Sequence, residues 1–394
     1  MKTDDKKRSS VPPEKHMEPD ALYRKLQQHL DRMPVPFPAT DSGVEIRILR
    51  QIFTPEEAEL TLQASAIPES AATIHRRVKP AMPLAEVANR LDQMAAKGII
   101  LRMRTPGGPL YAKMMFAVGF YERQLKRLTP ELERDCREYL MGAYGQGLHT
   151  RKTTQLRTVP VNKTIAIERN VATYADIRGY VESHGGPFAA MDCICRHGRE
   201  LVGEKCKQIG PKENCLTLGV AARGMVNAGQ ARSITREEML AILDAADRDG
   251  LVLQPENTKN PLFVCCCCGC CCAVLTSAKR FPQPAEHFSS NFQADVDAVL
   301  CDACAVCQSR CQMDALVDGD GDGDGKMQVD RERCIGCGLC VTTCPPGALR
   351  LVEREQRKVP PDDTRALYMQ LLQERYGPWG MAKLAGRKLL GMKF

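Results

Sequence analysis

Eight cysteines between Cys301 and Cys344 constrain this chain more than any other feature, because they repeat one ligand spacing twice. Residues 301–311 and 334–344 both read C-x2-C-x2-C-x3-C. In this spacing the first three thiolates bind one [4Fe-4S] cluster and the fourth binds the other. A pair of zinc sites fits poorly, because zinc sites rarely use three such short steps in a row. The spacing therefore predicts one cluster on Cys301, Cys304, Cys307 and Cys344, and a second on Cys311, Cys334, Cys337 and Cys340.

A second concentration of thiols lies upstream, where cysteine fills every position from 265 to 272 except Gly269. Isolated buried thiols are common, but packing does not explain this density. Four cysteines earlier in the chain, at positions 193, 195, 206 and 215, are natural partners. With the seven cysteines of the run they make eleven thiols, more than one four-ligand centre needs. We therefore predict a further iron–sulfur centre, with zinc as the competing occupant. Which cysteines bind stays open among Cys193, Cys195, Cys206, Cys215, Cys265, Cys267, Cys268, Cys270 and Cys271.

Composition bears on the cell compartment and on the partners. The chain has 394 residues and 20 cysteines, and its start lacks an apolar signal segment, so a reducing cytoplasm fits better than a disulfide-bonded secreted protein. We find no run of about 18 apolar residues that would span a membrane. The formal charge of +7 is largely offset by thiolate-bound clusters, each with a net charge of about −2. Net charge therefore gives little support to nucleic-acid binding.

The patterns predict an α+β chain in five parts. Helical periodicity in 44–53, 70–78 and 83–97, followed by a hairpin over 99–114, is the order of a winged helix. A second hairpin over 251–264 leads into the cysteine run. The predicted parts are a disordered tail (1–20), a helical, winged-helix-like domain (21–150), a Cys-rich middle domain (151–284), a two-cluster ferredoxin domain (285–355) and C-terminal helices (356–394).

Several stretches are similar to the large bacterial 4Fe-4S ferredoxin-like proteins with an N-terminal winged-helix-like region. The matching stretches are 43–49, 155–161, 193–196, 251–255, 267–271 and 311–315. The resemblance implies cluster binding and electron transfer, without a named reaction. The chain departs from the pattern at Gln312, where proline is usual, and at Cys266, where similar proteins carry a polar residue. We therefore leave Cys266 out of the candidate ligands.

The leading hypothesis is a cytoplasmic electron-transfer protein that exchanges electrons with a separate redox partner protein. No nucleotide-binding fingerprint or small-molecule substrate is evident, so an electron carrier or redox subunit fits better than a freestanding enzyme. One alternative is a cluster-sensing DNA-binding regulator that would read DNA through Asn89, Arg90, Gln93 and Lys97. That helix is mostly apolar, so we expect no nucleic-acid partner. An enzyme with substrate at the middle centre is another alternative. The basic stretch 379–394 predicts a packing helix or a peripheral membrane contact.

Overall fold

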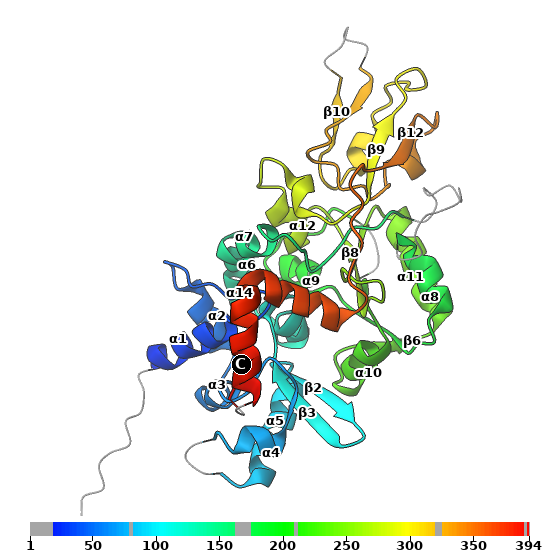
Figure 1. The fold of residues 1–394 in the computed structure, drawn as a ribbon. Coiled ribbons are helices and arrows are strands. Elements are labelled where there is room, and N and C mark those ends of the chain that lie inside the picture. The colour runs from blue at the N-terminus through cyan, green and yellow to red at the C-terminus, as the bar shows by residue number, and fades with distance from the viewer. Residues whose placement is uncertain are drawn as a thin grey trace, which may run out of the picture.

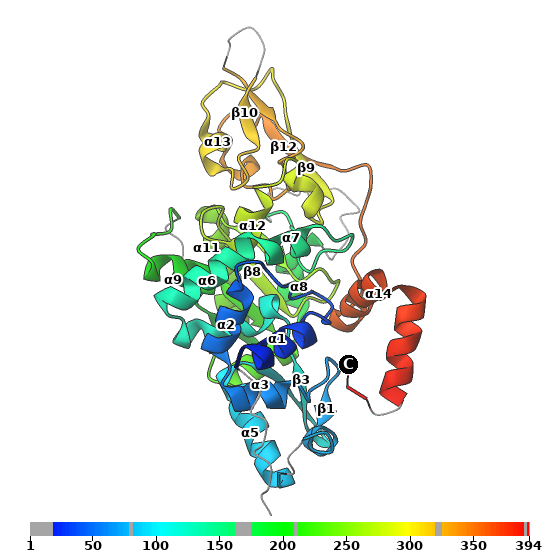
Figure 2. The ribbon, with the colours of Figure 1, turned by 90° about the vertical axis from the view of Figure 1, so that its left-hand side faces the viewer.

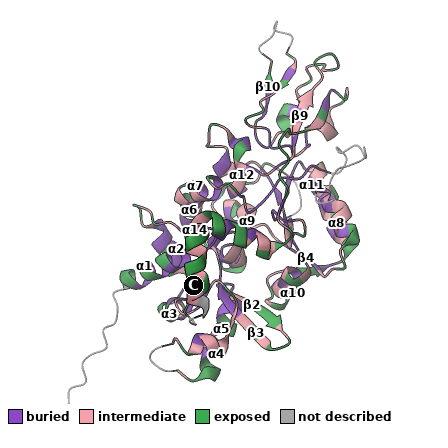
Figure 3. Ribbon diagram, in the orientation of Figure 1, coloured by how far each residue is buried: buried purple, intermediate pink, exposed green. Residues whose placement is uncertain are grey.

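The computed structural model describes residues 19–78, 82–161, 175–208, 212–319, 325–389 and 392–393. All but the last two residues of the predicted disordered tail lie outside this set. The molecule is elongated, with N-terminal helices at one end and the ferredoxin region at the other (Figures 1 and 2). A five-stranded sheet lies between them. Figure 3 shows that the N-terminal helices and the sheet contain many buried residues.

The N-terminal helices form where the capping signals place them. Thr54 caps helix α3 and Glu57 completes the capping box, as the sequence predicts. Phe37, Phe116 and Tyr139 pack edge to face at the centre of this core. The elements are α1 (Pro19–Leu30), α2 (Val44–Ile52), α3 (Pro55–Thr61), η1 (Phe116–Phe120), η2 (Glu122–Arg127), α6 (Pro130–Met141) and α7 (Ala143–His149).

The expected hairpin after the third helical stretch is present. Gly98 ends α5 in a left-handed conformation (φ 83°), and strands β2 and β3 then pair antiparallel, Ile100 opposite Lys113. Two side chains that the DNA-binding alternative would place in a groove make ion pairs within the protein: Arg90 binds Glu86 at 2.7 Å, and Lys97 binds Glu57. The elements are β1 (Glu69–Ser70), α4 (Ala71–His75), α5 (Leu84–Lys97), β2 (Ile100–Thr105) and β3 (Gly108–Lys113).

The middle region is an antiparallel sheet in the order β6-β4-β5-β8-β7. The predicted hairpin is β7 and β8, whereas β4 and β5 were not foreseen from sequence. Residues 156–159 run beside β7 through isolated bridges, and residues 162–174 lie outside the described residues. The elements are α8 (Ile177–Ser183), β4 (Phe188–Met191), α9 (Ile194–Leu201), β5 (Cys215–Leu218), α10 (Gly219–Asn227), β6 (Arg232–Ile234), α11 (Arg236–Arg248), β7 (Val252–Pro255), β8 (Phe263–Cys267) and α12 (Ala273–Ala278).

The ferredoxin region consists of two small antiparallel sheets, β9 with β12 and β10 with β11. Its first strand ends at Val296. The Asp297 carboxylate accepts hydrogen bonds from the amides of Val299 and Leu300 and turns the chain there. The elements are η5 (Pro284–His287), β9 (Phe292–Val296), α13 (Val306–Arg310), β10 (Leu316–Asp318), β11 (Met327–Val329), η6 (Val341–Thr343) and β12 (Leu349–Glu353).

The C-terminal helix α14 (Thr364–Leu389) returns to the N-terminal helices. Leu367 and Leu371 are buried in the N-terminal core, and the Arg375 guanidinium donates to the Met33 carbonyl at 2.8 Å. Gly377 bends the helix just before Pro378 (Figure 2). None of the described helices combines the length and the apolar character that a bilayer crossing requires.

Candidate metal centres

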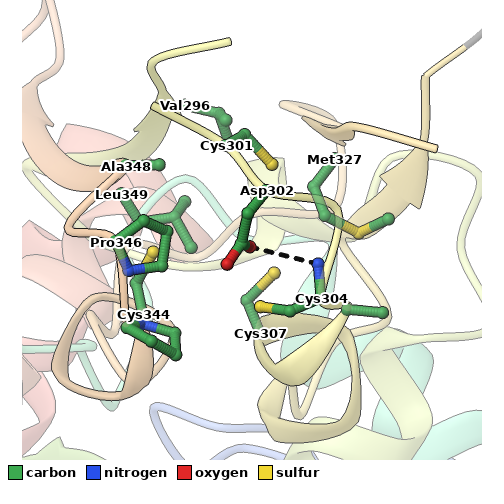
Figure 4. A pocket seen from close by; sticks show the side chains of 12 residues that line it. Val296, Cys301, Asp302, Cys304, Cys307, Met327, Cys344, Pro346, Ala348 and Leu349 are labelled. Atoms are coloured by element: carbon green, nitrogen blue, oxygen red, sulfur yellow. Dashed lines mark hydrogen bonds between the residues drawn. The ribbon is translucent and has the colours of Figure 1, made fainter. Parts of the chain in front are cut away.

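The first predicted cluster set lines one pocket at the far end of the ferredoxin region. Cys301, Cys304, Cys307 and Cys344 surround it together with Met327, Pro345 and Leu349 (Figure 4). The Asp302 carboxylate accepts a hydrogen bond from the Cys304 amide at 3.2 Å, which shapes the loop between the first two ligands. Cys304 is exposed, whereas Cys307 is buried. The structure thus brings together four thiols that are up to 43 residues apart in sequence (344 − 301).

The second predicted set lies deeper. Burial and the neighbouring thiols Cys337, Cys334 and Cys311 raise the pKa of Cys340 well above its usual value. Cys307 of the first set also contributes to this rise, so the two sets are neighbours. The Ala294 amide donates to Cys334 Sγ at 3.3 Å, and the Ala315 amide donates to Cys311 Sγ at 3.2 Å. Such N–H donors suit a sulfur that carries negative charge.

Six thiols of the middle region form one ring of neighbours. On the sheet, Cys215 lies directly opposite Cys265, and their side chains share a face with Cys267. Hydrogen bonding to Cys215 and Cys267 holds the pKa of Cys265 well below its usual value. We call this set the six-thiol group, and the interactions that close it run between Cys193 and Cys195, Cys195 and Cys272, Cys267 and Cys272, and Cys193 and Cys265.

Buried polar groups surround the six-thiol group. Gln254 is fully buried on β7, opposite Cys265, and neither atom of its side-chain amide has a hydrogen-bond partner. Glu122 lies near Cys265 and Cys215, and burial raises the pKa of its carboxyl to about 7. An orphaned buried amide carries a free-energy cost of about 1–3 kcal/mol. A charged group at this site would give the Gln254 amide a partner.

The other middle thiols form a separate, tighter set. Cys206, Cys268, Cys270 and Cys271 have Sγ atoms that all lie within 4.8 Å of one another, and we call this set the four-thiol group. Cys206 comes from the loop after α9, and the other three follow β8. The structure therefore divides the predicted ligand candidates into two groups. It also adds Cys272, which is not among those candidates, to the six-thiol group. Cys266 is buried, follows Cys265 and precedes Cys267 in the sequence, and belongs to neither group.

The middle thiols share one buried core with the second cluster set. Cys266, Cys267 and Cys268 share a buried core with Met313 and Leu339, and Cys311 and Cys337 pack against that core. The Gly269 amide donates to the Gln312 side chain at 2.6 Å. A Cβ at Gly269 would lie 2.2 Å from the Gln312 carbonyl oxygen, so only glycine permits this approach. Gln312 occupies the position where proline is usual, and its side chain makes the contact.

Comparison with known proteins supports the ferredoxin region. A 4Fe-4S binding domain model matches residues 327–350, which contain Cys334, Cys337, Cys340 and Cys344. A stretch of 62 residues is 39% identical to an uncharacterised ferredoxin of Methanocaldococcus jannaschii. This stretch covers 15% of the present chain and 38% of that ferredoxin. The chain thus carries a C-terminal ferredoxin domain of the 4Fe-4S binding type. These matches support an electron-transfer role. The DNA-binding alternative gains no support from them.

Proposed function

We propose that this protein is an electron-transfer protein with two [4Fe-4S] clusters in its ferredoxin region and a further iron–sulfur centre at the six-thiol group. The observation that carries the proposal is the continuous packing of the three thiol sets, from the middle sheet to the exposed Cys304. Bound clusters would supply one-electron transfer. The chain itself holds the thiolates, excludes water and leaves one edge open.

The thiols themselves argue for bound metal. Burial and thiol neighbours raise the pKa of Cys337 to about 12, and they raise the pKa of Cys215 and Cys267 well above the usual value. Several buried thiolates repel one another and lose hydration, so ionising them together without a cation is costly. A metal centre offsets this cost, because its positive charge stabilises the thiolates.

The surface beside Cys304 fits a protein partner. Val299 is 89% exposed and Leu300 is 51% exposed, and both lie next to the first cluster set in the chain. Asp302 and Asp318 are exposed in the same region. An apolar patch edged by carboxylates favours a redox partner with a basic docking face. We propose that this edge is where electrons leave or enter the protein.

Metal analysis and EPR on anaerobically purified protein test the cluster content. We expect about twelve or more iron atoms per chain, since two cubanes account for about eight. Dithionite should produce the spectrum of interacting reduced clusters. About eight iron atoms would remove the further centre from the proposal. Iron that dithionite does not reduce would contradict the electron-transfer role.

The docking edge is tested with a basic c-type cytochrome as electron acceptor. The oxidation rate of the reduced protein should fall several-fold as the salt concentration rises from about 20 to about 200 mM, because salt screens the attraction between the partners. Val299→Ser should slow the reaction. Val220→Ser is the matched control, because Val220 is 67% exposed on α10 in the middle region. Equal rates for both variants would place the contact elsewhere.

A further inference from the structure

The four-thiol group differs from the other thiol sets in its spacing. Cys206 Sγ lies 3.6 Å from both Cys268 Sγ and Cys270 Sγ, and Cys270 and Cys271 are also 3.6 Å apart. Among the described residues, no other trio of Cys, His or carboxylate side chains brings its ligand atoms mutually within 4.8 Å. Neither ferredoxin set has three sulfurs that all lie within this distance of one another.

The spacing distinguishes one ion from a cluster. Zinc binds thiolate sulfur at about 2.3 Å, so the sulfurs of a tetrahedral site are about 3.8 Å apart. In a cubane each thiolate binds a different iron, and the ligand sulfurs must be further apart because the irons occupy separate corners. The distances of 3.6 Å match the single ion. Four thiolates also fill every position of a tetrahedron, as in structural zinc sites.

We propose that Cys206, Cys268, Cys270 and Cys271 bind one structural zinc ion, separate from the six-thiol group. Zinc with four thiolates carries a net charge of −2. Arg196 is partly buried beside Cys206 and Cys268 and supplies a compensating positive charge. The backbone amide of Lys207 hydrogen-bonds Cys270, a further donor to thiolate sulfur.

The ion would connect two segments that lie far apart in the sequence, since Cys206 and Cys268 are 62 residues apart. Cys206 lies in an irregular loop between α9 and β5, with exposed lysines at 205 and 207. The other three ligands adjoin Gly269, which contacts Gln312 of the ferredoxin region. A zinc ion here would fasten the loop and stiffen the segment against which the second cluster set packs. This role does not depend on electron transfer.

Zinc-edge X-ray absorption on the wild-type full-length protein is the direct test. We expect one zinc per chain, with four sulfur ligands at about 2.3 Å. Because this measurement uses unaltered protein, it does not depend on the folding of any variant. A zinc content near zero in protein produced with added zinc, or a nitrogen or oxygen ligand shell, would overturn the proposal.

Ligand variants then locate the ion. Cys206→Ser and Cys271→Ser should each lower the zinc content at least five-fold, while the iron content and the EPR spectrum stay as in wild type. Trypsin should cleave Cys206→Ser faster after Lys205 and Lys207. Cys266→Ala is the matched control in the same cysteine run, and it should retain zinc. If Cys206→Ser instead lost iron while its zinc content stayed as in wild type, the four-thiol group would be assigned to an iron–sulfur cluster.

Discussion

At the scale of single residues, the buried side-chain amide of Gln254 is the group most suited to adjusting the reduction potential of the middle centre. It faces the side of the sheet that carries Cys265, and it has no hydrogen-bond partner there. An N–H donor stabilises the more negative, reduced form of a sulfur-ligated centre and so raises its reduction potential. A hydrogen bond to a charged group contributes about 1.5–3 kcal/mol. Its loss can therefore shift a one-electron reduction potential by on the order of 50 mV or more.

Gln254→Leu should therefore lower the potential of the further centre by on the order of 50 mV without reducing the iron content. The measurement is an EPR-monitored redox titration. The ferredoxin clusters serve as the internal control, because their ligands lie on other elements and their potentials should not move. An unchanged potential at the middle centre would show that Gln254 does not interact with it.

At the scale of elements, the segment after β8 sets the distance between the middle region and the ferredoxin region. Gly269→Ala would place a methyl group against the Gln312 carbonyl, which is backbone and cannot rotate away. We expect a loss of about 1–3 kcal/mol in stability, the usual cost of overpacking. Weaker magnetic coupling between the middle and ferredoxin centres should accompany it.

Gly224→Ala is the matched control for this substitution. Gly224 lies inside helix α10, and a Cβ there would meet no atom within 4 Å. Alanine is the better helix former by about 1 kcal/mol, so this variant should be neutral or slightly more stable. Thermal unfolding and EPR of the two variants compare them directly. Equal stability and equal EPR spectra in the two variants would mean that the segment after β8 can move without affecting either the stability or the magnetic coupling.

At the scale of the whole molecule, the chain closes on itself through α14. Leu371 is fully buried in the N-terminal core, whereas Met369 is 47% exposed on the same helix. Leu371→Ala should lower the stability by about 2–5 kcal/mol, because it leaves a cavity in a close-packed core. Met369→Ala should change it little. The thermal midpoint, with the visible absorbance of the clusters followed in parallel, tests this prediction.

A contrary result would also be informative at this scale. If Leu371→Ala left the midpoint unchanged, α14 would be a loosely attached element rather than part of the N-terminal core. The predicted peripheral membrane contact through the basic C-terminus stays a prediction. Lys393, one of its charges, donates to the Leu62 carbonyl at 2.7 Å, so it already has a partner within the protein.

Local spacing made part of the molecule predictable. Three thiols of each ferredoxin set follow from short steps within a single loop, and the caps at Thr54 and Gly98 follow from residues adjacent to their helices. Strand alternation in β8 also separates Cys265 and Cys267 from Cys266, a signal present in the sequence. These features depend on neighbours within a few residues, where backbone geometry leaves few choices.

Ligand spacing alone predicts metal binding at two ferredoxin motifs and at a dense run of middle cysteines. The three-dimensional fold divides that run between two groups, with Cys193, Cys195 and Cys215 joining one part of it and Cys206 joining another. These partners come from separate helices, strands and loops. Their meeting depends on strand order and on core packing, which act over distances in the chain that no local spacing encodes.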